Sequence, residues 1–229
     1  MLRWLYYLRK PVILFCMMIM IGVSIAMILT TLLGTGRFVM PYDMSSWSAV
    51  QMISLVTALL PMTVFEADAE SGYEKYSAVM PVSRRKYITS AFIYFGTLTI
   101  ILSLFASVSP ILATIIGGVF EWKYALLGVS LCLSGNLILI FIIISIMLSV
   151  NRIFRIIGVI ITFTFVFLFV YPGVVTGDMI AVVMEKFLNM IIAGSEGLNL
   201  ISILSLTVTA AVGLVAWEIS CALYKRRSF

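Results

Sequence analysis

The residues best able to take part in chemistry or binding lie in a short insert between two uncharged hydrophobic segments. Residues 66–86 hold eight of the chain's 25 charged side chains. Acidic residues come first, tyrosines follow, and a proline with a basic cluster comes last: Glu66, Asp68, Glu70, Tyr73, Glu74, Lys75, Tyr76, Pro81, Arg84, Arg85 and Lys86. Because the surrounding sequence is built for lipid, this insert is the segment best suited to contact a partner outside the membrane.

The spacing within the insert predicts a short helix with an aromatic face. Tyr73, Tyr76 and Met80 recur at i, i+3 and i+7, while Glu70 and Glu74 lie toward the N-terminal end, where negative charge is favourable. The proline at position 81 ends this helix, and the serine at position 83 can cap the next one. An aromatic helix face of this kind fits a groove on a soluble partner.

The sequence lacks the residues of several catalytic classes. Histidine is absent, which removes the commonest metal ligand and the usual general base of intramembrane hydrolases. Cys16, Cys132 and Cys221 lie in hydrophobic segments and predict neither a disulfide framework nor a metal site. No Gly-x-x-x-x-Gly-Lys-Ser/Thr sequence occurs, so any ATP must be bound by another polypeptide. We expect no enzyme activity, no cofactor held by this chain and no nucleic-acid partner.

Composition predicts an all-α polytopic membrane protein. Of 229 residues, 62% are hydrophobic and 11% are charged, against roughly 45–50% and 25% in soluble domains. The longest stretch between apolar segments is about two dozen residues, shorter than the roughly 40 residues that an independent core needs. We therefore expect a single transmembrane domain over residues 1–229.

Six segments are long and apolar enough to cross a hydrocarbon core of ~30 Å, which takes about 20 helical residues. They are residues 12–33, 47–65, 87–111, 124–150, 156–174 and 198–223. The third is ambiguous because its uncharged run continues to Phe120 and contains Pro110. Since proline removes a helical hydrogen bond, we expect the helix to end or kink there and residues 111–120 to form a short outer segment.

The basic residues predict the orientation. With six spans and a cytoplasmic N-terminus, twelve of the fifteen basic residues lie on the cytoplasmic side. Splitting the third segment into two spans would leave nine inside and six outside. The sequence thus predicts that both termini and residues 66–86 are cytoplasmic.

Two flanking segments are amphipathic. Residues 1–11 alternate apolar and basic side chains before Pro11, which predicts an interfacial helix, with a flexible cationic tail as the alternative. The outer stretch 177–198 predicts one or two short helices that dip into the membrane, hinged near residues 194–197. Its alternative is a surface helix that only closes the loop.

Few polar groups lie inside the predicted spans. Glu218 is the one charge there, close to the cytoplasmic end, and we expect it to snorkel or to pair with the C-terminal tail. Thr57, Thr97 and Asn136 are candidates to line a pathway. For Asn136 a hydrogen bond between helices is the favoured alternative. Such mild polarity suits a large amphipathic or apolar cargo better than an ion.

The insert resembles the cytoplasmic signature of bacterial type-2 ABC exporter permeases, the six-helix membrane subunits of ABC transporters. The matching residues are Asp68, Glu70, Gly72, Tyr73, Glu74, Lys75 and Tyr76, followed by Met80, Pro81, Val82, Ser83 and Arg84. Six spans with both ends inside, an interfacial first helix and a membrane-dipping segment before the last helix are similar to that family along the whole chain.

This resemblance implies that residues 66–86 form a coupling loop that docks on a separate ABC ATPase subunit, which would bind ATP and Mg²⁺. The implied coupling residues are Asp68, Glu70, Gly72, Tyr73, Glu74, Tyr76, Met80, Pro81, Arg84 and Arg85. It also implies a location in the bacterial cell membrane, a second permease copy or paralogue, and a cargo such as a hydrophobic or antimicrobial peptide. The competing interpretation is a membrane scaffold or assembly factor that docks a cytosolic partner through the same loop.

Overall fold

The computed structural model describes four continuous stretches and several single positions. These are residues 61–66, 84–116, 120–149 and 195–226, with positions 18, 21, 22, 25, 29, 68, 118, 155, 157, 158, 160 and 164. Three long helices dominate: α5 (Arg84–Ile116), α6 (Trp122–Ser149) and α10 (Ser195–Arg226). Regular structure in the described residues is helical throughout, which confirms the all-α prediction, and each long helix contains a stretch able to cross a membrane.

The sequence located two of these helices closely. The predicted spans 124–150 and 198–223 differ from α6 and α10 by three residues or fewer at each end. Agreement is expected because a long apolar run in lipid has to satisfy its backbone groups internally, and a helix does so within one segment. The first four residues of α10 come from the stretch predicted as an outer amphipathic segment.

Of the two outcomes predicted at Pro110, an end or a kink of the helix, the end is wrong. Helix α5 continues through Pro110 to Ile116, so residues 111–116 belong to the same helix and not to a separate outer segment. Proline removes one helical hydrogen bond, whereas ending the helix at this point would leave its last four carbonyls without partners inside the helix. The continuous helix therefore has the lower free energy. Because α5 is continuous, this segment is not divided into two spans at Pro110.

A tight turn reverses the chain between α5 and α6. Gly118 has a positive φ of 70° and its N–H donates to the carbonyl of Ile115 at 3.1 Å. A glycine in this left-handed conformation is a common way to close the C-terminus of a helix. Helix α6 begins four residues later, with the carbonyl of Glu121 accepting from the N–H of Ala125.

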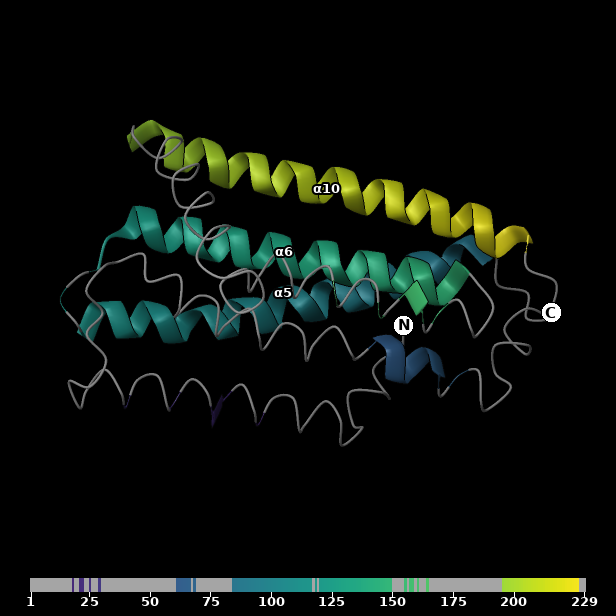
Figure 1. Cartoon of the computed structure of the whole chain (residues 1–229), viewed down its shortest axis with the longest axis horizontal. Coiled ribbons are helices and arrows are strands. Elements are labelled where there is room, and N and C mark those ends of the chain that lie inside the picture. The colour runs from purple at the N-terminus through teal and green to yellow at the C-terminus, as the bar shows by residue number, and fades with distance from the viewer. Residues whose placement is uncertain are drawn as a thin grey trace.

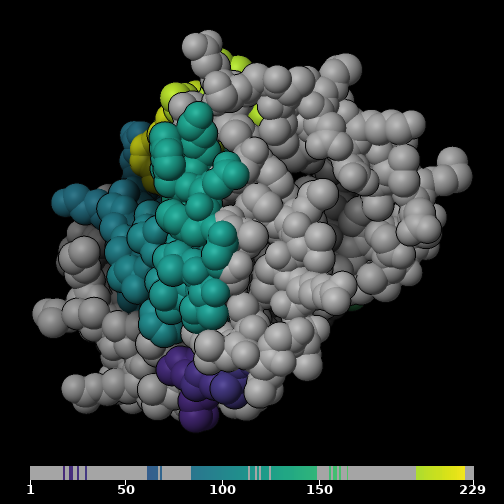
Figure 2. All heavy atoms as spheres, turned by 90° about the vertical axis from the view of Figure 1, so that its left-hand side faces the viewer, coloured from purple at the N-terminus to yellow at the C-terminus, as the bar shows by residue number. Residues whose placement is uncertain are grey.

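The three helices lie side by side, with α6 in contact with both others (Figure 1). Helix α5 runs antiparallel to α6 and α10, so its start lies beside the ends of the other two. Figure 2 shows the bundle from its other end, where α5 is followed by α6. In this view α5 and α6 lie between α10 and the described atoms of residues 18–29. The bundle thus has an end defined by the start of α5 and an end defined by the turn at Gly118.

The interior differs between these two ends. The apolar core gathers residues from helix 61–66, the first turns of α5 and the last turns of α6 and α10, among them Phe65, Ile88, Phe95, Ile143, Leu148 and Tyr224. Toward the Gly118 turn, buried positions include many small hydroxyl side chains, such as Ser103, Ser107, Ser130 and Ser134. Small polar residues of this kind allow membrane helices to approach closely.

Several predictions lie outside the described residues. They are the interfacial helix 1–11, most of the insert 66–86 and residues 177–194 of the outer segment. Single helical positions fall within the predicted spans 12–33 and 156–174. Six spans and cytoplasmic termini therefore stay predictions.

Candidate functional site

The structure places three of the ten predicted coupling residues, at the two edges of the insert. Asp68 lies at its start, whereas Arg84 and Arg85 are the first residues of α5. Asp68 is 1% exposed, so within a single chain its carboxylate lies in the interior and not on an exposed docking surface. The remaining seven lie outside the described residues: Glu70, Gly72, Tyr73, Glu74, Tyr76, Met80 and Pro81.

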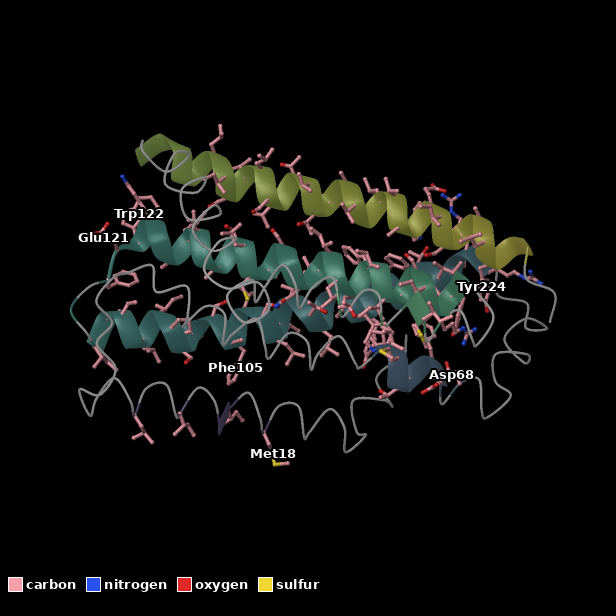
Figure 3. The ribbon with its side chains drawn as sticks, in the orientation of Figure 1. Met18, Asp68, Phe105, Glu121, Trp122 and Tyr224 are labelled. Carbon is pink, nitrogen blue, oxygen red and sulfur yellow. The ribbon has the colours of Figure 1, made fainter. Side chains whose placement is uncertain are left out.

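Both edges of the insert rest on the same apolar core. Before the insert, Val64 and Phe65 are buried in this core, and the ring centroid of Phe65 lies 5.7 Å from that of Phe95 in α5. After the insert, Ile88 of α5 is buried in it as well. Figure 3 shows Asp68 and Tyr224 at this end of the bundle, with Glu121 and Trp122 at the other. The insert therefore leaves and re-enters the bundle at one place.

Arg84 binds a backbone carbonyl at the C-terminal end of α10. Its Nη1 donates to the backbone carbonyl of Tyr224 at 3.4 Å, in the last turn of α10. The last four carbonyls of a helix have no partner within that helix, and the helix dipole makes this end negative. A cation is unfavourable in the first turn of α5, but here it lies at the end of α10 that attracts it.

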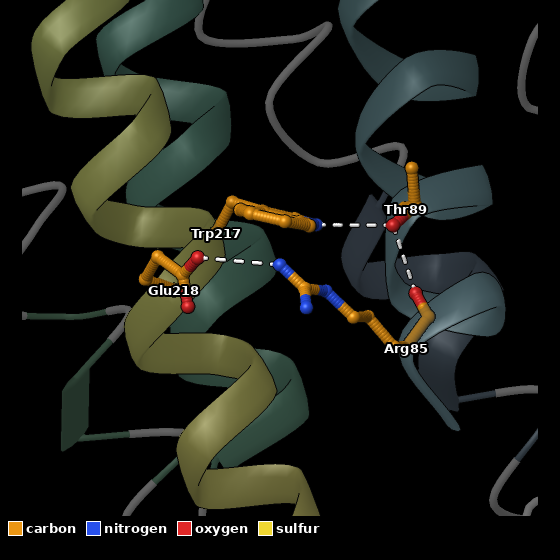
Figure 4. Close-up of polar contacts among 4 residues, drawn as sticks. All are labelled: Arg85, Thr89, Trp217 and Glu218. Carbon is orange, nitrogen blue, oxygen red and sulfur yellow. Dashed lines mark hydrogen bonds and ion pairs between the residues drawn. The ribbon is translucent and has the colours of Figure 1, made fainter. Parts of the chain in front are cut away.

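Arg85 makes a cluster of contacts with α10 (Figure 4). Its guanidinium carbon lies 4.6 Å from the ring centroid of Trp217, and its Nη2 lies 3.4 Å from Oε1 of Glu218. The indole N–H of Trp217 donates to the hydroxyl oxygen of Thr89 at 3.1 Å, and that hydroxyl donates to the carbonyl of Arg85 at 2.8 Å. One turn of α5 is thus held by two successive residues of α10.

An aromatic pair lies beside this cluster. The rings of Tyr87 and Tyr224 stack with centroids 5.9 Å apart, and Tyr224 is buried. We define the α5–α10 junction as Arg84, Arg85, Tyr87 and Thr89 of α5 with Trp217, Glu218 and Tyr224 of α10. It joins residues 128 to 140 positions apart in the sequence.

The polar part of the junction adds little to the stability of the fold. The side chains of Arg85 and Glu218 are 57% and 63% exposed, and an ion pair at such positions contributes about 0–1 kcal/mol. A cation–π contact at an exposed site contributes about 0.5–1 kcal/mol. The apolar core beneath holds the helices together, and the polar contacts fix which turn of α5 faces which turn of α10.

Comparison with known proteins assigns the family. A family model described as ABC-2 family transporter protein matches residues 2–225. The chain belongs to this family. No curated protein and no solved structure matches the chain. With its candidate membrane spans, the protein is a multi-pass membrane permease of the ABC-2 transporter family, whose members typically lack catalytic activity.

Sequence reasoning missed the partner of Glu218 in this permease. It predicted snorkelling or pairing with the C-terminal tail, whereas the partner that the structure shows is Arg85 of α5. One signal could have indicated such a contact. Arg84 and Arg85 stand in a first helical turn, where the helix dipole disfavours cations, and this placement indicates that a compensating group is nearby.

The predicted pathway candidates have different positions in the permease. Asn136 is 5% exposed, and its Nδ2 donates to Oγ of Ser103 on α5 at 2.8 Å, so it does make the predicted hydrogen bond between helices. Thr97 lies on the exposed face of α5. Thr57 lies outside the described residues.

No cluster that could hold a metal ion occurs in the described part of the permease. Nowhere among the described residues do three or more His, Cys, Asp or Glu side chains lie close enough together to bind one ion. The free thiols at Cys132 and Cys221 are buried in helices α6 and α10.

Proposed function

We propose that this permease is the membrane subunit of an ATP-driven exporter, and that residues 66–86 dock on a separate ABC ATPase. The observation that carries the proposal is the shared anchoring of the insert. Phe65 before it and Ile88 after it are buried in one core with the ends of α6 and α10. A force applied to the insert would therefore act on several membrane helices together, as a coupling element must.

The ATPase would supply the chemistry. ATP and Mg²⁺ would be bound by that partner, because this chain contains no phosphate-binding loop of the Gly-x-x-x-x-Gly-Lys-Ser/Thr type. A second permease, either another copy or a paralogue, would complete the pathway, since cyclic two-fold pairing is the commonest form of oligomer.

The cargo that best fits the permease is hydrophobic or amphipathic, such as a peptide. Between Lys123 and Ser149, helix α6 carries no charged residue, and between Lys86 and Ile116, neither does α5. Ion-coupled carriers place ionisable groups within their spans, because a charge there is costly and is retained for a function. The uncharged interior of these two helices supports a cargo that does not need such groups.

The test begins with purification of the complex from native membranes. An ATP-binding subunit should copurify, and the double change Tyr73→Ala with Tyr76→Ala should lower ATP hydrolysis by the complex to the rate of the ATPase alone. The matched control is Tyr42→Ala, a tyrosine in the predicted outer loop, which should leave hydrolysis unchanged. Absence of any ATP-binding subunit would contradict the proposal.

The scaffold interpretation gives a different result in the same experiment. A scaffold would retain its cytosolic partner through residues 66–86, but hydrolysis by that partner would not depend on the insert. Loss of binding in the tyrosine variant without any change in the specific rate of hydrolysis would therefore favour a docking scaffold over a transporter.

A further inference from the structure

The junction connects the insert to a helix that is distant in the sequence. Arg84 and Arg85 follow the insert directly, whereas Trp217 and Glu218 lie in the last membrane helix. The two sides are 128 or more positions apart where the indole of Trp217 meets Thr89. These contacts therefore give a movement of the insert that reaches α5 a route to this part of α10.

The contacts of the junction are of several kinds, and all of them join the first turns of α5 to α10. The guanidinium of Arg85 lies over the face of Trp217 while one of its nitrogens faces the carboxylate of Glu218 (Figure 4). The indole N–H binds Thr89 one turn further along α5. A ring face, a carboxylate and an N–H on two successive residues of α10 thus make three different contacts with one turn of α5.

The same turns of α10 also contact α6. Near Ser145, α10 contacts α6 through the paired hydroxyls of Ser145 and Ser220, 3.0 Å apart, and through the Ser145 hydroxyl, which donates to the carbonyl of Ala216 at 3.2 Å. These contacts hold α10 to α6 and not to the insert. Together with the shared apolar core, the junction is therefore a link through which the insert could act on α10.

We propose that Trp217 and Glu218 are coupling residues, which with Arg85 make the start of α5 and the end of α10 move as one unit when the insert moves. This proposal rests on the proposed function, because the ATPase supplies the movement. It assigns a role to two residues of the last helix, far from the insert in the sequence. They act through Arg85 and are positioning residues.

The test measures distance across the junction in the complete complex. Spin labels are attached at Lys86→Cys and Ala222→Cys, both exposed, in a chain whose Cys16, Cys132 and Cys221 are replaced by alanine. The permease is purified with its ATPase in lipid nanodiscs and measured by pulsed electron paramagnetic resonance. The probe is a non-hydrolysable ATP analogue, added to one half of each sample.

With the junction intact, we expect one narrow distance that is the same with and without the analogue. In the variant Trp217→Leu with Glu218→Gln, we expect the distance to shift or broaden when the analogue binds. The conservative change Trp217→Phe keeps a ring under the guanidinium and should retain most of the fixed distance. A double variant whose distance stays unchanged with nucleotide bound would overturn the proposal.

A second label pair controls for general loosening of the fold. Labels at Ile142→Cys and Val215→Cys report on the packing of α6 against α10, and both residues are exposed. This distance should stay the same in the intact protein and in the double variant. If it changes together with the junction distance, the double variant has disturbed the bundle as a whole, and the coupling role is contradicted.

The experiment separates the two proposals. If no ATP-binding subunit copurifies, the proposed function fails and the coupling role fails with it. If the ATPase is bound, responds to the analogue and depends on Tyr73 and Tyr76, but the junction distance ignores the double variant, only the coupling role fails.

Discussion

Single residues in this permease gain their roles from partners on other helices. Arg84 and Arg85 lie in the first turn of α5, where the helix dipole disfavours cations. Contacts with the carbonyl of Tyr224 and the carboxylate of Glu218 offset this unfavourable interaction. The positive charge that predicts a cytoplasmic location therefore also binds the end of α10. One pair of residues serves both orientation and helix packing.

Asn136 provides a test at the scale of one residue. Replacing it with alanine removes the hydrogen bond to Ser103 between α5 and α6. We expect Asn136→Ala to lower the free energy of unfolding by about 0.6 kcal/mol, the average measured for hydrogen bonds between membrane helices, and by no more than about 1.7 kcal/mol, the largest value measured. Unfolding in detergent, titrated with a denaturing detergent, would measure this change.

The matched control for that prediction is Ser134→Ala on the same helix. Ser134 is buried too, but its hydroxyl makes no hydrogen bond within the described part of the chain. Losing a buried hydroxyl that has no partner should be close to neutral or slightly stabilising. A cost at Ser134 equal to that at Asn136 would contradict a specific role for the Asn136 hydrogen bond.

Packing among the three long helices depends on the ring of Phe141, which lies against two glycines. Phe141 of α6 stacks on Phe92 of α5 with centroids 5.5 Å apart, and it also lies against Gly96 of α5 and Gly213 of α10. A methyl group added at Gly213 would lie 2.7 Å from Cε2 of Phe141, closer than the atoms can approach. Because Phe92 stacks on the ring and Gly96 lies near its Cε1 atom, the ring has little room to move away.

Gly213→Ala should therefore separate α10 from α6. Overpacking of this kind costs about 1–3 kcal/mol, and the midpoint of unfolding should fall accordingly. Gly135→Ala is the matched control, because a methyl group there meets nothing within 4 Å. Its greater helix propensity should be neutral or stabilising by up to about 1 kcal/mol. Equal destabilisation by both changes would show that the contact with Phe141 is not the cause.

At the scale of the whole molecule, the described basic side chains are more numerous at one end of the bundle. Arg84, Arg85 and Lys86 lie at the end where the insert joins it, together with the acidic Asp68 and Glu218, whereas Glu121 and Lys123 lie at the opposite end (Figure 3). Because basic residues are enriched on the cytoplasmic side of a membrane, we expect the end with the insert to be cytoplasmic.

Cysteine accessibility would test this orientation. In a chain without native cysteines, Glu121→Cys should react with a membrane-impermeant maleimide in intact cells, and Lys86→Cys should react only after permeabilisation. Both side chains are exposed, so differences in burial should not determine the result. Labelling of position 86 in intact cells would place the insert outside and exclude its docking on a cytosolic ATPase.

The sequence by itself determined the class of this protein and the extent of its long helices. Uncharged runs of more than 20 residues have few stable alternatives in lipid, because each backbone polar group has to be bonded within the segment. Local composition is therefore enough to place α6 and α10 within three residues. The same local reasoning failed to predict that α5 continues past Pro110, where ending the helix would leave four carbonyls without partners and the proline removes one hydrogen bond.

Only the tertiary structure decided which residues meet. The pairing of Arg85 with Glu218, the contact of Arg84 with Tyr224 and the bond between Asn136 and Ser103 join helices far apart in the sequence. Such pairs depend on how the helices are ordered, turned and aligned in the bundle, and each helix alone is compatible with many alignments. The sequence predicts that the insert contacts a partner, and the fold shows that the helix following the insert is joined to the last helix of the permease.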